Sequence, residues 1–393
     1  IRSSDTNWLD VIIDESISYN TDFSYRYGKE DMQLFASLNY TRDNGIQKYT
    51  HYERYNARLN TSFDFWDDRI IIGENFLYSN FNEVQANEFE NAILQNPLIP
   101  VYTVDGDYTA PTIQDKANSL ANLWSNRKNE QRNNRLLGNV FAKIDILDGL
   151  TFDTSLNFDY TEFAFDTRTQ PFVQVGRIPS VFNNITVSKD RNNSLRTIWT
   201  NLLTYDFEIN KHRFNLLGGV EFTKEDFEST VELTNGVDIT EYPSYIIQSD
   251  AEFRTIENEI QYRKQSFFGS LKYVYDDRYI LSGSMRRDGS SRFGPNNKFA
   301  IYPAGSFAWN VSNESFLEDS DLISNLKLRA SYGINGNDQI PNFLYLSTFY
   351  NSSIGNAIEF LNYDIDGDGI GVSEGIVQAR QANPDIQWEQ TAQ

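Results

Sequence analysis

Three carboxylates at alternating positions, Asp364, Asp366 and Asp368, carry the clearest chemistry in this sequence. They belong to the run Asp-Ile-Asp-Gly-Asp-Gly, whose glycine at the sixth position matches the start of a calcium-binding loop. The twelfth position of such a loop should be a bidentate glutamate, but it is Gly375, and Glu374 comes one residue early. Two alternatives therefore stay open: a weak calcium site, or a solvated acidic loop tip.

Aromatic side chains in the long polar segments form a second candidate set. The sequence contains 28 Phe, 23 Tyr and 6 Trp, and such rings can stack on sugar rings or on peptide side chains. For each ring taken singly, packing within its loop or contact with a partner protein is the favoured explanation. Taken together, they predict contact with a ligand. The candidates are Tyr102, Tyr108, Trp124, Tyr242, Tyr245 and Tyr345.

An arginine-rich stretch, residues 286–292, could recognise an anionic ligand. We favour a structural role, in which its arginines pair with acidic loops or with carboxylates of a strand wall. Catalysis finds no support, because His51 and His212 are the only histidines and no nucleophile elbow or zinc-ligand spacing occurs. The sequence therefore predicts that the chain is not an enzyme.

Composition excludes several classes of function. The net charge of −21 argues against a nucleic-acid partner, since binding phosphates requires a basic face. No segment approaches the roughly 18 consecutive apolar residues of a transmembrane helix. Cysteine is absent, which suits a closed barrel, because its backbone groups pair within its own ladder and need no disulfides.

Alternating apolar and polar residues predict β-strands along most of the chain. The clearest hairpin spans residues 136–160 and turns at Asp148-Gly149, where a tight turn requires residues that tolerate positive φ. Its second arm divides into two faces. The apolar face carries Phe152, Leu156 and Phe158, which we expect to meet lipid, and the polar face carries Asp153, Asn157 and Asp159.

Short turns alternate with long polar loops throughout the sequence. This asymmetry is typical of outer-membrane barrels, which have short periplasmic turns and long external loops. The pattern predicts an all-β, transmembrane antiparallel barrel to which this chain contributes about twelve strands. We expect the chain to be an internal piece of a longer polypeptide. The predicted turns lie near residues 28–31, 66–68, 148–149, 210–212 and 276–277, and the predicted loops at about 79–135, 161–196, 223–261 and 333–385.

Several segments carry a family resemblance. The strongest is YDDRYILSGSMRRDGSSRFG at residues 275–294, which continues through Pro303 to Ala308-Trp309. Others are LKLRASYG at 326–333, NPDIQWE at 383–389 and TNWLD at 6–10. Together they resemble the SusC/RagA-type TonB-dependent transporters of Bacteroidota outer membranes, over nearly the whole chain.

The resemblance implies a fold, a location and partners. It implies a barrel of about 22 strands in the outer membrane, with residues 1–15 linking a plug to the barrel and residues 16–393 forming its front and middle part. It also implies import of bulky nutrients, either oligosaccharides or peptides. The implied partners are a SusD-like surface lipoprotein acting as a lid, outer-membrane lipid, and TonB through a plug region absent from this chain. The alternative is a surface-binding or structural barrel without TonB-coupled transport.

Overall fold

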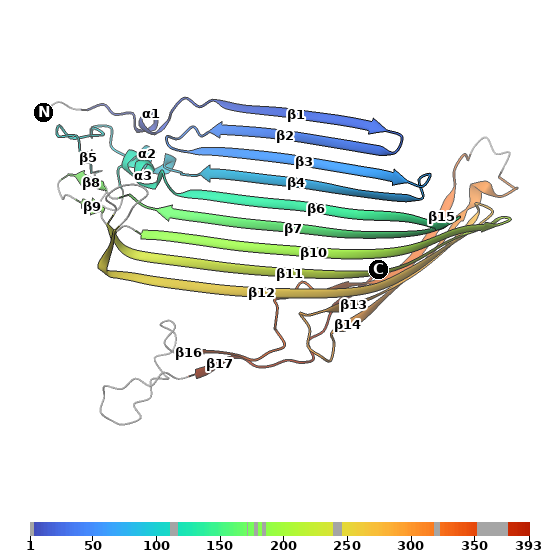
Figure 1. The fold of residues 1–393 in the computed structure, drawn as a ribbon. Helices are drawn as coiled ribbons and strands as arrows, with labels where there is room; N and C mark the ends of the chain where they lie inside the picture. Colours follow the sequence, from blue (N-terminus) through green and yellow to red (C-terminus); the bar gives the residue numbers. More distant parts are fainter. Residues whose placement is uncertain are drawn as a thin grey trace, which may run out of the picture. The chain divides into compact units, whose positions relative to one another are not determined.

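The computed structural model describes residues 4–110, 117–170, 172–176, 180–182, 186–238, 246–317, 323–351 and 376–393. Within these residues, thirteen strands form one sheet whose order follows the chain (Figure 1). The order is β1 (Ser18–Lys29), β2 (Met32–Asn44), β3 (His51–Phe65), β4 (Ile70–Val84), β6 (Glu130–Leu147), β7 (Leu150–Arg168), β10 (Thr186–Ile209), β11 (His212–Asp238), β12 (Ile246–Tyr275), β13 (Tyr279–Ser290), β14 (Phe299–Asn310), β15 (Lys327–Asn337) and β18 (Glu389–Ala392).

The predicted tight turns are confirmed, and the predicted number of about twelve strands is close to the observed thirteen. Between β12 and β13, Asp276 and Asp277 have φ angles of 50° and 54°. Such angles match the twist of a tight hairpin, and short polar side chains tolerate them. Lys211 Nζ donates a hydrogen bond of 2.9 Å to Asp276, and this bond holds the pKa of the Asp276 carboxyl below its usual range.

The strands extend far into three segments that the sequence predicted as loops. The prediction of a loop over 223–261 was wrong, because β11 continues to Asp238 and β12 starts at Ile246. The predicted loops over 161–196 and 79–135 are shortened in the same way. The sequence of segment 223–261 contains ten acidic and two basic residues. So many charged residues interrupt the alternation of apolar and polar residues by which a strand is recognised in a sequence. The strands continue there because their backbones pair with neighbouring strands.

The chain divides into two compact units, each containing part of the long strands. Besides strands, the first unit holds α1 (Trp8–Ile12), α2 (Phe89–Leu94), α3 (Ser119–Asn126) and a small sheet of β5 (Tyr108–Thr109), β8 (Phe172–Val175) and β9 (Ser180–Phe182). The second holds η1 (Val311–Asn313) and the hairpin of β16 (Thr348–Asn351) and β17 (Ile376–Arg380), which lies within the predicted loop 333–385. The first unit comprises Ile1–Phe141, Asn157–Arg196 and Asp226–Ile260, and the second Ala142–Leu156, Thr197–Glu225 and Gln261–Gln393.

In the first unit, the helices gather at one end of β1 to β4 (Figure 1) and share a small apolar core. Trp8, Ile12, Ala92 and Leu123 are buried together in this core. Helix α3 begins after Asn118, whose side-chain oxygen accepts hydrogen bonds from two free backbone N–H groups of the first turn. No helix in the described part of the chain has both the length and the apolar character needed to cross a membrane.

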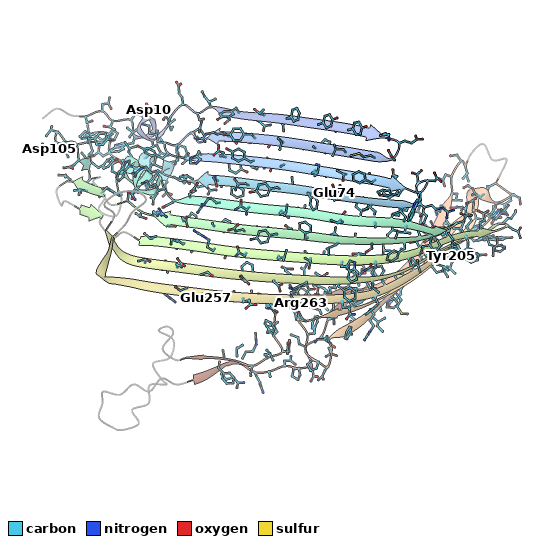
Figure 2. All side chains as sticks on the ribbon, in the orientation of Figure 1. Asp10, Glu74, Asp105, Tyr205, Glu257 and Arg263 are labelled. Carbon is cyan, nitrogen blue, oxygen red and sulfur yellow. The ribbon has the colours of Figure 1, made fainter. Side chains whose placement is uncertain are left out.

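One sheet face of the first unit is apolar and uncovered. The register places Phe23 opposite Leu38, and Leu59 opposite Phe76. Phe23 is 65% exposed and Leu38 is 60% exposed, whereas a water-soluble sheet would cover a continuous apolar face of this kind. The same face also carries Glu74 (Figure 2), which accepts a hydrogen bond from the Thr61 hydroxyl. The exposed apolar residues make this the face that we expect to meet lipid.

The second unit has an apolar face as well, bordered near the tight turns by a ladder of aromatic rings. Leu281 and Leu328 on this face are 53% and 54% exposed. Neighbouring ring centroids in the ladder are 4.8 to 6.4 Å apart. Amphipathic rings of this kind gather where a barrel passes from hydrocarbon to water. The ladder consists of Phe207, Phe214, Tyr273, His212, Tyr275, Tyr279 and Trp309.

The predicted division of the hairpin over 136–160 into two faces is confirmed. Phe158 lies over Gly138, and its ring centroid is 5.8 Å from that of Phe76 on the apolar face. On the opposite face, Asn139 Nδ2 donates a hydrogen bond of 2.7 Å to Asn157. Contact of the Phe158 face with lipid stays a prediction.

The contact between Gly138 and Phe158 gives a first testable prediction. A Cβ atom at Gly138 would collide with the Phe158 ring, so Gly138→Val should lower the free energy of unfolding by about 1–3 kcal/mol. Gly218 is the matched control, because a Cβ atom there meets nothing within 4 Å. Urea titration of the full-length protein in lipid vesicles measures both variants. Equal stability of Gly138→Val and Gly218→Val would contradict this packing.

Candidate functional site: the polar face of the first unit

The polar side chains of β2, β3, β4 and β6 lie on the sheet face opposite Phe23 and Leu38. Because side chains alternate along each strand, the register makes Asn39, Asn56 and Ser79 direct neighbours on this face. Their position follows from strand pairing alone. In a barrel whose apolar face meets lipid, this polar face is turned to the interior.

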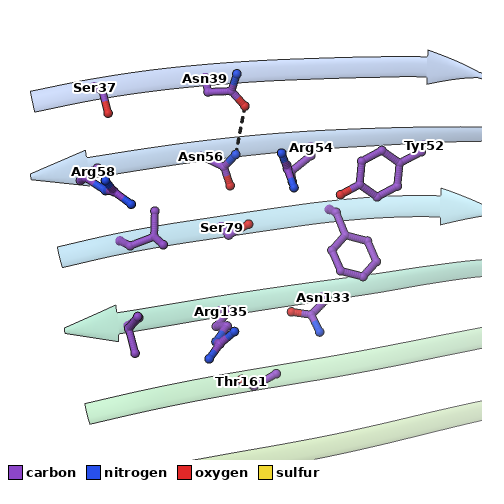
Figure 3. A pocket seen from close by; sticks show the side chains of 13 residues that line it. Ser37, Asn39, Tyr52, Arg54, Asn56, Arg58, Ser79, Asn133, Arg135 and Thr161 are labelled. Carbon is purple, nitrogen blue, oxygen red and sulfur yellow. Dashed lines mark hydrogen bonds between the residues drawn. The ribbon is translucent and has the colours of Figure 1, made fainter. Parts of the chain in front are cut away.

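A hollow of about 630 Å³ opens on the polar face (Figure 3). Tyr52 and Phe81 line part of it, with ring centroids 5.6 Å apart. The remaining lining is dominated by amides and guanidinium groups that come from several different strands. These polar residues are Asn39, Asn56, Asn133, Arg54, Arg58 and Arg135.

Amide groups on this face bond to one another in a ladder that crosses the strands. Asn56 Nδ2 donates to Asn39 Oδ1 at 3.0 Å, as the dashed line in Figure 3 marks. Asn39 Nδ2 in turn donates to Asn20 Oδ1 and to Asp22 Oδ1, each at 2.7 Å. Such a ladder fixes the orientation of its amides. It therefore presents a preformed set of donors and acceptors to the hollow.

The guanidinium groups of the hollow differ in their partners. Arg135 makes a two-pronged contact with Asp159, with Nε and Nη2 at 2.9 and 2.7 Å from the two carboxylate oxygens. Arg54 and Arg58 form no hydrogen bond or ion pair with any residue that the structure describes. The Nε atom of Arg54 is buried without a partner. Two guanidinium groups of the hollow therefore have no carboxylate partner among the described residues.

The structure describes four of the six predicted aromatic residues. Tyr102 and Tyr108 lie together in the first unit, with ring centroids 5.2 Å apart, and the Phe172 ring stands edge-on to Tyr108 at 6.0 Å. Burial raises the pKa of Tyr108 to about 12. Trp124 of α3 stacks under the Arg127 guanidinium at 3.9 Å. Each of these rings packs against a neighbouring side chain, and contact with a ligand stays a prediction.

The other predicted residues lie in the second unit or outside the described residues. Tyr345 belongs to the second unit, is partly buried, and accepts a backbone hydrogen bond from Asn383 at 3.2 Å. Among the described residues, no group of three or more His, Cys, Asp or Glu side chains is placed to hold a metal ion. Five predicted residues lie outside the described residues: Tyr242, Tyr245, Asp364, Asp366 and Asp368.

The arginine-rich stretch 286–292 has the structural role that the sequence predicted. Arg286 Nε lies 2.7 Å from Asp288, and its Nη2 lies 3.1 Å from Glu221 on β11. Arg287 covers the Phe299 ring at 4.1 Å. The Arg286 charge is therefore compensated by carboxylates of the strand wall.

Sequence reasoning missed Arg54, Asn56 and Arg58. The signal was present, because these residues alternate with Tyr55, Ala57 and Leu59 along β3. Alternation shows that they share a face. It does not show that β2, β4 and β6 bring further amides to the same place.

Comparison with known proteins finds similar receptors. No protein-family model matches the chain. TonB-dependent receptor P26 of Formosa agariphila is 29% identical over 98% of this chain and 38% of its own length. TonB-dependent receptor SusC of Bacteroides thetaiotaomicron is 26% identical over 100% of this chain and 40% of its own length. The chain is similar to TonB-dependent receptors of the SusC/RagA type.

A solved structure shares the fold of this chain. The structure of the RagAB peptide transporter matches with a TM-score of 0.79 at 20% identity, covering 100% of this chain and 44% of that one. The thirteen strands are therefore part of the wall of an outer-membrane β-barrel. The chain spans about two-fifths of the length of the curated relatives it matches. These relatives are receptors and transporters rather than enzymes.

Proposed function

We propose that this chain forms part of the barrel of a TonB-dependent importer of bulky nutrients, either oligosaccharides or peptides. The observation that carries the proposal is the division of the sheet into an uncovered apolar face and a polar face with a preformed hollow. A wall of this kind separates lipid from an aqueous path. The names of the relatives, TonB-dependent receptors and a peptide transporter, support import as the use of that path.

The proposal includes a division of labour within the whole receptor. Residues 1–15 lead from a plug to the barrel, and residues 16–393 supply barrel strands. A SusD-like surface lipoprotein closes over the long loops, and energy passed from TonB moves the plug so that the substrate enters. The predicted loop residues Tyr102, Tyr108, Trp124, Tyr242, Tyr245 and Tyr345 would face the substrate or this lid.

A calcium ion at Asp364, Asp366 and Asp368 is part of the same proposal. Carboxylates held close together repel one another, so an ion would order the loop they belong to. Calorimetric titration of the full-length receptor with calcium tests this, with Asp366→Asn as the control. Identical heats for both proteins would leave only a solvated acidic loop.

Transport measurements on the full-length receptor test the main proposal. Cells should take up fluorescently labelled oligosaccharides or peptides, lose this uptake when the receptor gene is deleted, and lose it equally when TonB is deleted. Deletion of an unrelated outer-membrane barrel is the control. Uptake that depends on the receptor but survives the loss of TonB would favour the alternative, a surface barrel without TonB-coupled transport.

A further inference from the structure

Arg54 and Arg58 have uncharged residues directly opposite them on both adjoining strands. They lie two positions on either side of Asn56 on β3, all three facing the hollow. Direct cross-strand neighbours are the residues that most readily compensate a charge in a sheet. Here they are Thr41 and Phe81 beside Arg54, and Ser37 and Leu77 beside Arg58.

Carboxylates that could compensate such a charge are available in the chain. The sequence has 55 acidic and 34 basic residues, so carboxylates are abundant. Other wall arginines use them: Arg135 pairs with Asp159, and Arg42 lies 3.5 Å from Glu53. A shortage of carboxylates therefore does not explain the charge left in the hollow.

The chemistry of the guanidinium group defines what would complete the site. Arginine stays charged at all physiological pH values, and its planar fork matches the two oxygens of a carboxylate or sulfate. A buried donor without an acceptor, such as Arg54 Nε, costs free energy that an incoming anion would recover. The amides of Asn39, Asn56 and Asn133 around it can bind hydroxyl or carbonyl groups of the same molecule.

We propose that Arg54 and Arg58 bind the anionic groups of the imported substrate, so that the receptor selects oligomers carrying carboxylate or sulfate groups. This inference rests on the proposed import function. Tyr52 and Phe81 add an apolar contact for the body of such an oligomer. The shared chemistry is the anion, whether it belongs to an acidic oligosaccharide or to an acidic peptide.

A single cysteine can measure the charge of the hollow directly. Ser79 lines the hollow beside Asn56, and Ser79→Cys is introduced into a full-length receptor free of other cysteines. Its rates of reaction with a sulfonate-bearing and a trimethylammonium-bearing methanethiosulfonate are compared. Replacing both arginines, Arg54→Gln with Arg58→Gln, should lower the anionic-to-cationic rate ratio by about fivefold.

The control and the contradicting result use the same labelling. Arg69→Gln removes an equal charge in the turn before β4, beyond screening distance, and should leave the ratio unchanged. An unchanged ratio in the double variant would overturn the proposal, because it would mean that another group already neutralises both arginines.

Protection of the Ser79→Cys thiol from labelling identifies the source of the anion. The competitors are oligogalacturonate against its methyl ester, and a glutamate hexapeptide against a glutamine hexapeptide. The proposal is supported if an acidic competitor protects the thiol, its neutral counterpart does not, and the protection is lost in the double arginine variant. The competitor that protects, oligogalacturonate or the glutamate hexapeptide, then identifies the substrate class. Protection by neither acid, or equally by the neutral forms, overturns it. Since labelling requires no transport, a receptor that shows this protection but fails to import would contradict the proposed function alone.

Discussion

Replacing Leu156 by arginine should lower the free energy of unfolding of the barrel by about 2–4 kcal/mol if the residue lies near the bilayer midplane. Leu156 belongs to the apolar face and is 46% exposed. A charge placed there must lose its water or distort the bilayer. Urea titration of the full-length receptor in lipid vesicles measures the loss.

Asn157→Arg is the matched control, because it places the same charge one position along the strand on the polar face. It removes the hydrogen bond from Asn139 to Asn157 and should cost about 1 kcal/mol. A larger loss for Asn157→Arg than for Leu156→Arg would reverse our assignment of the faces. The hollow would then face lipid, and its proposed contact with substrate would fail.

Epitope tags at the two ends of the strands should differ completely in their labelling by antibody on intact cells. A tag inserted within residues 239–245, between β11 and β12, should be labelled by antibody on intact cells. A tag in the turn at Asp67-Asp68 should be labelled only after the cells are permeabilised. The physical reason is that outer-membrane barrels keep their short turns in the periplasm and their long connections outside.

As a control for the accessibility of each tag, antibody should label both tags equally on permeabilised cells. Labelling of only the Asp67-Asp68 tag on intact cells would invert the topology. The small core of α1, α2 and α3 would then lie in the periplasm, where it could not meet a surface lipoprotein.

The sequence predicted those parts of the fold in which alternation is complete. The turns at Asp148-Gly149 and Asp276-Asp277 and the two faces of β7 follow from local chemistry, since positive φ and period-two patterning act over a few residues. The outer halves of β11 and β12 could not be predicted. Their charged residues occupy both faces, and only pairing with neighbouring strands identifies them as strand.

The helices and the hollow were missed for a related reason. Helices of five to eight residues such as α1 and α3 are stabilised by tertiary packing, here around Trp8 and Leu123, which local pattern does not reveal. The hollow needs the register of several strands at once, because Arg54 becomes a site only beside Asn39 and Asn133. Loop aromatics such as Tyr102 were easier to notice in the sequence, but they pack against one another.

The small core of α1, α2 and α3 has a consequence for the order in which the wall assembles. Two residues connect β1 to β2, whereas residues 85–129 connect β4 to β6. Closing a flexible connection roughly twenty times longer costs about 3 kcal/mol more in chain entropy. Packing of Trp8, Ile12, Ala92 and Leu123 shortens the free part of this connection. We therefore expect hairpins with tight turns to form first, and β6 to join β4 once these helices have packed.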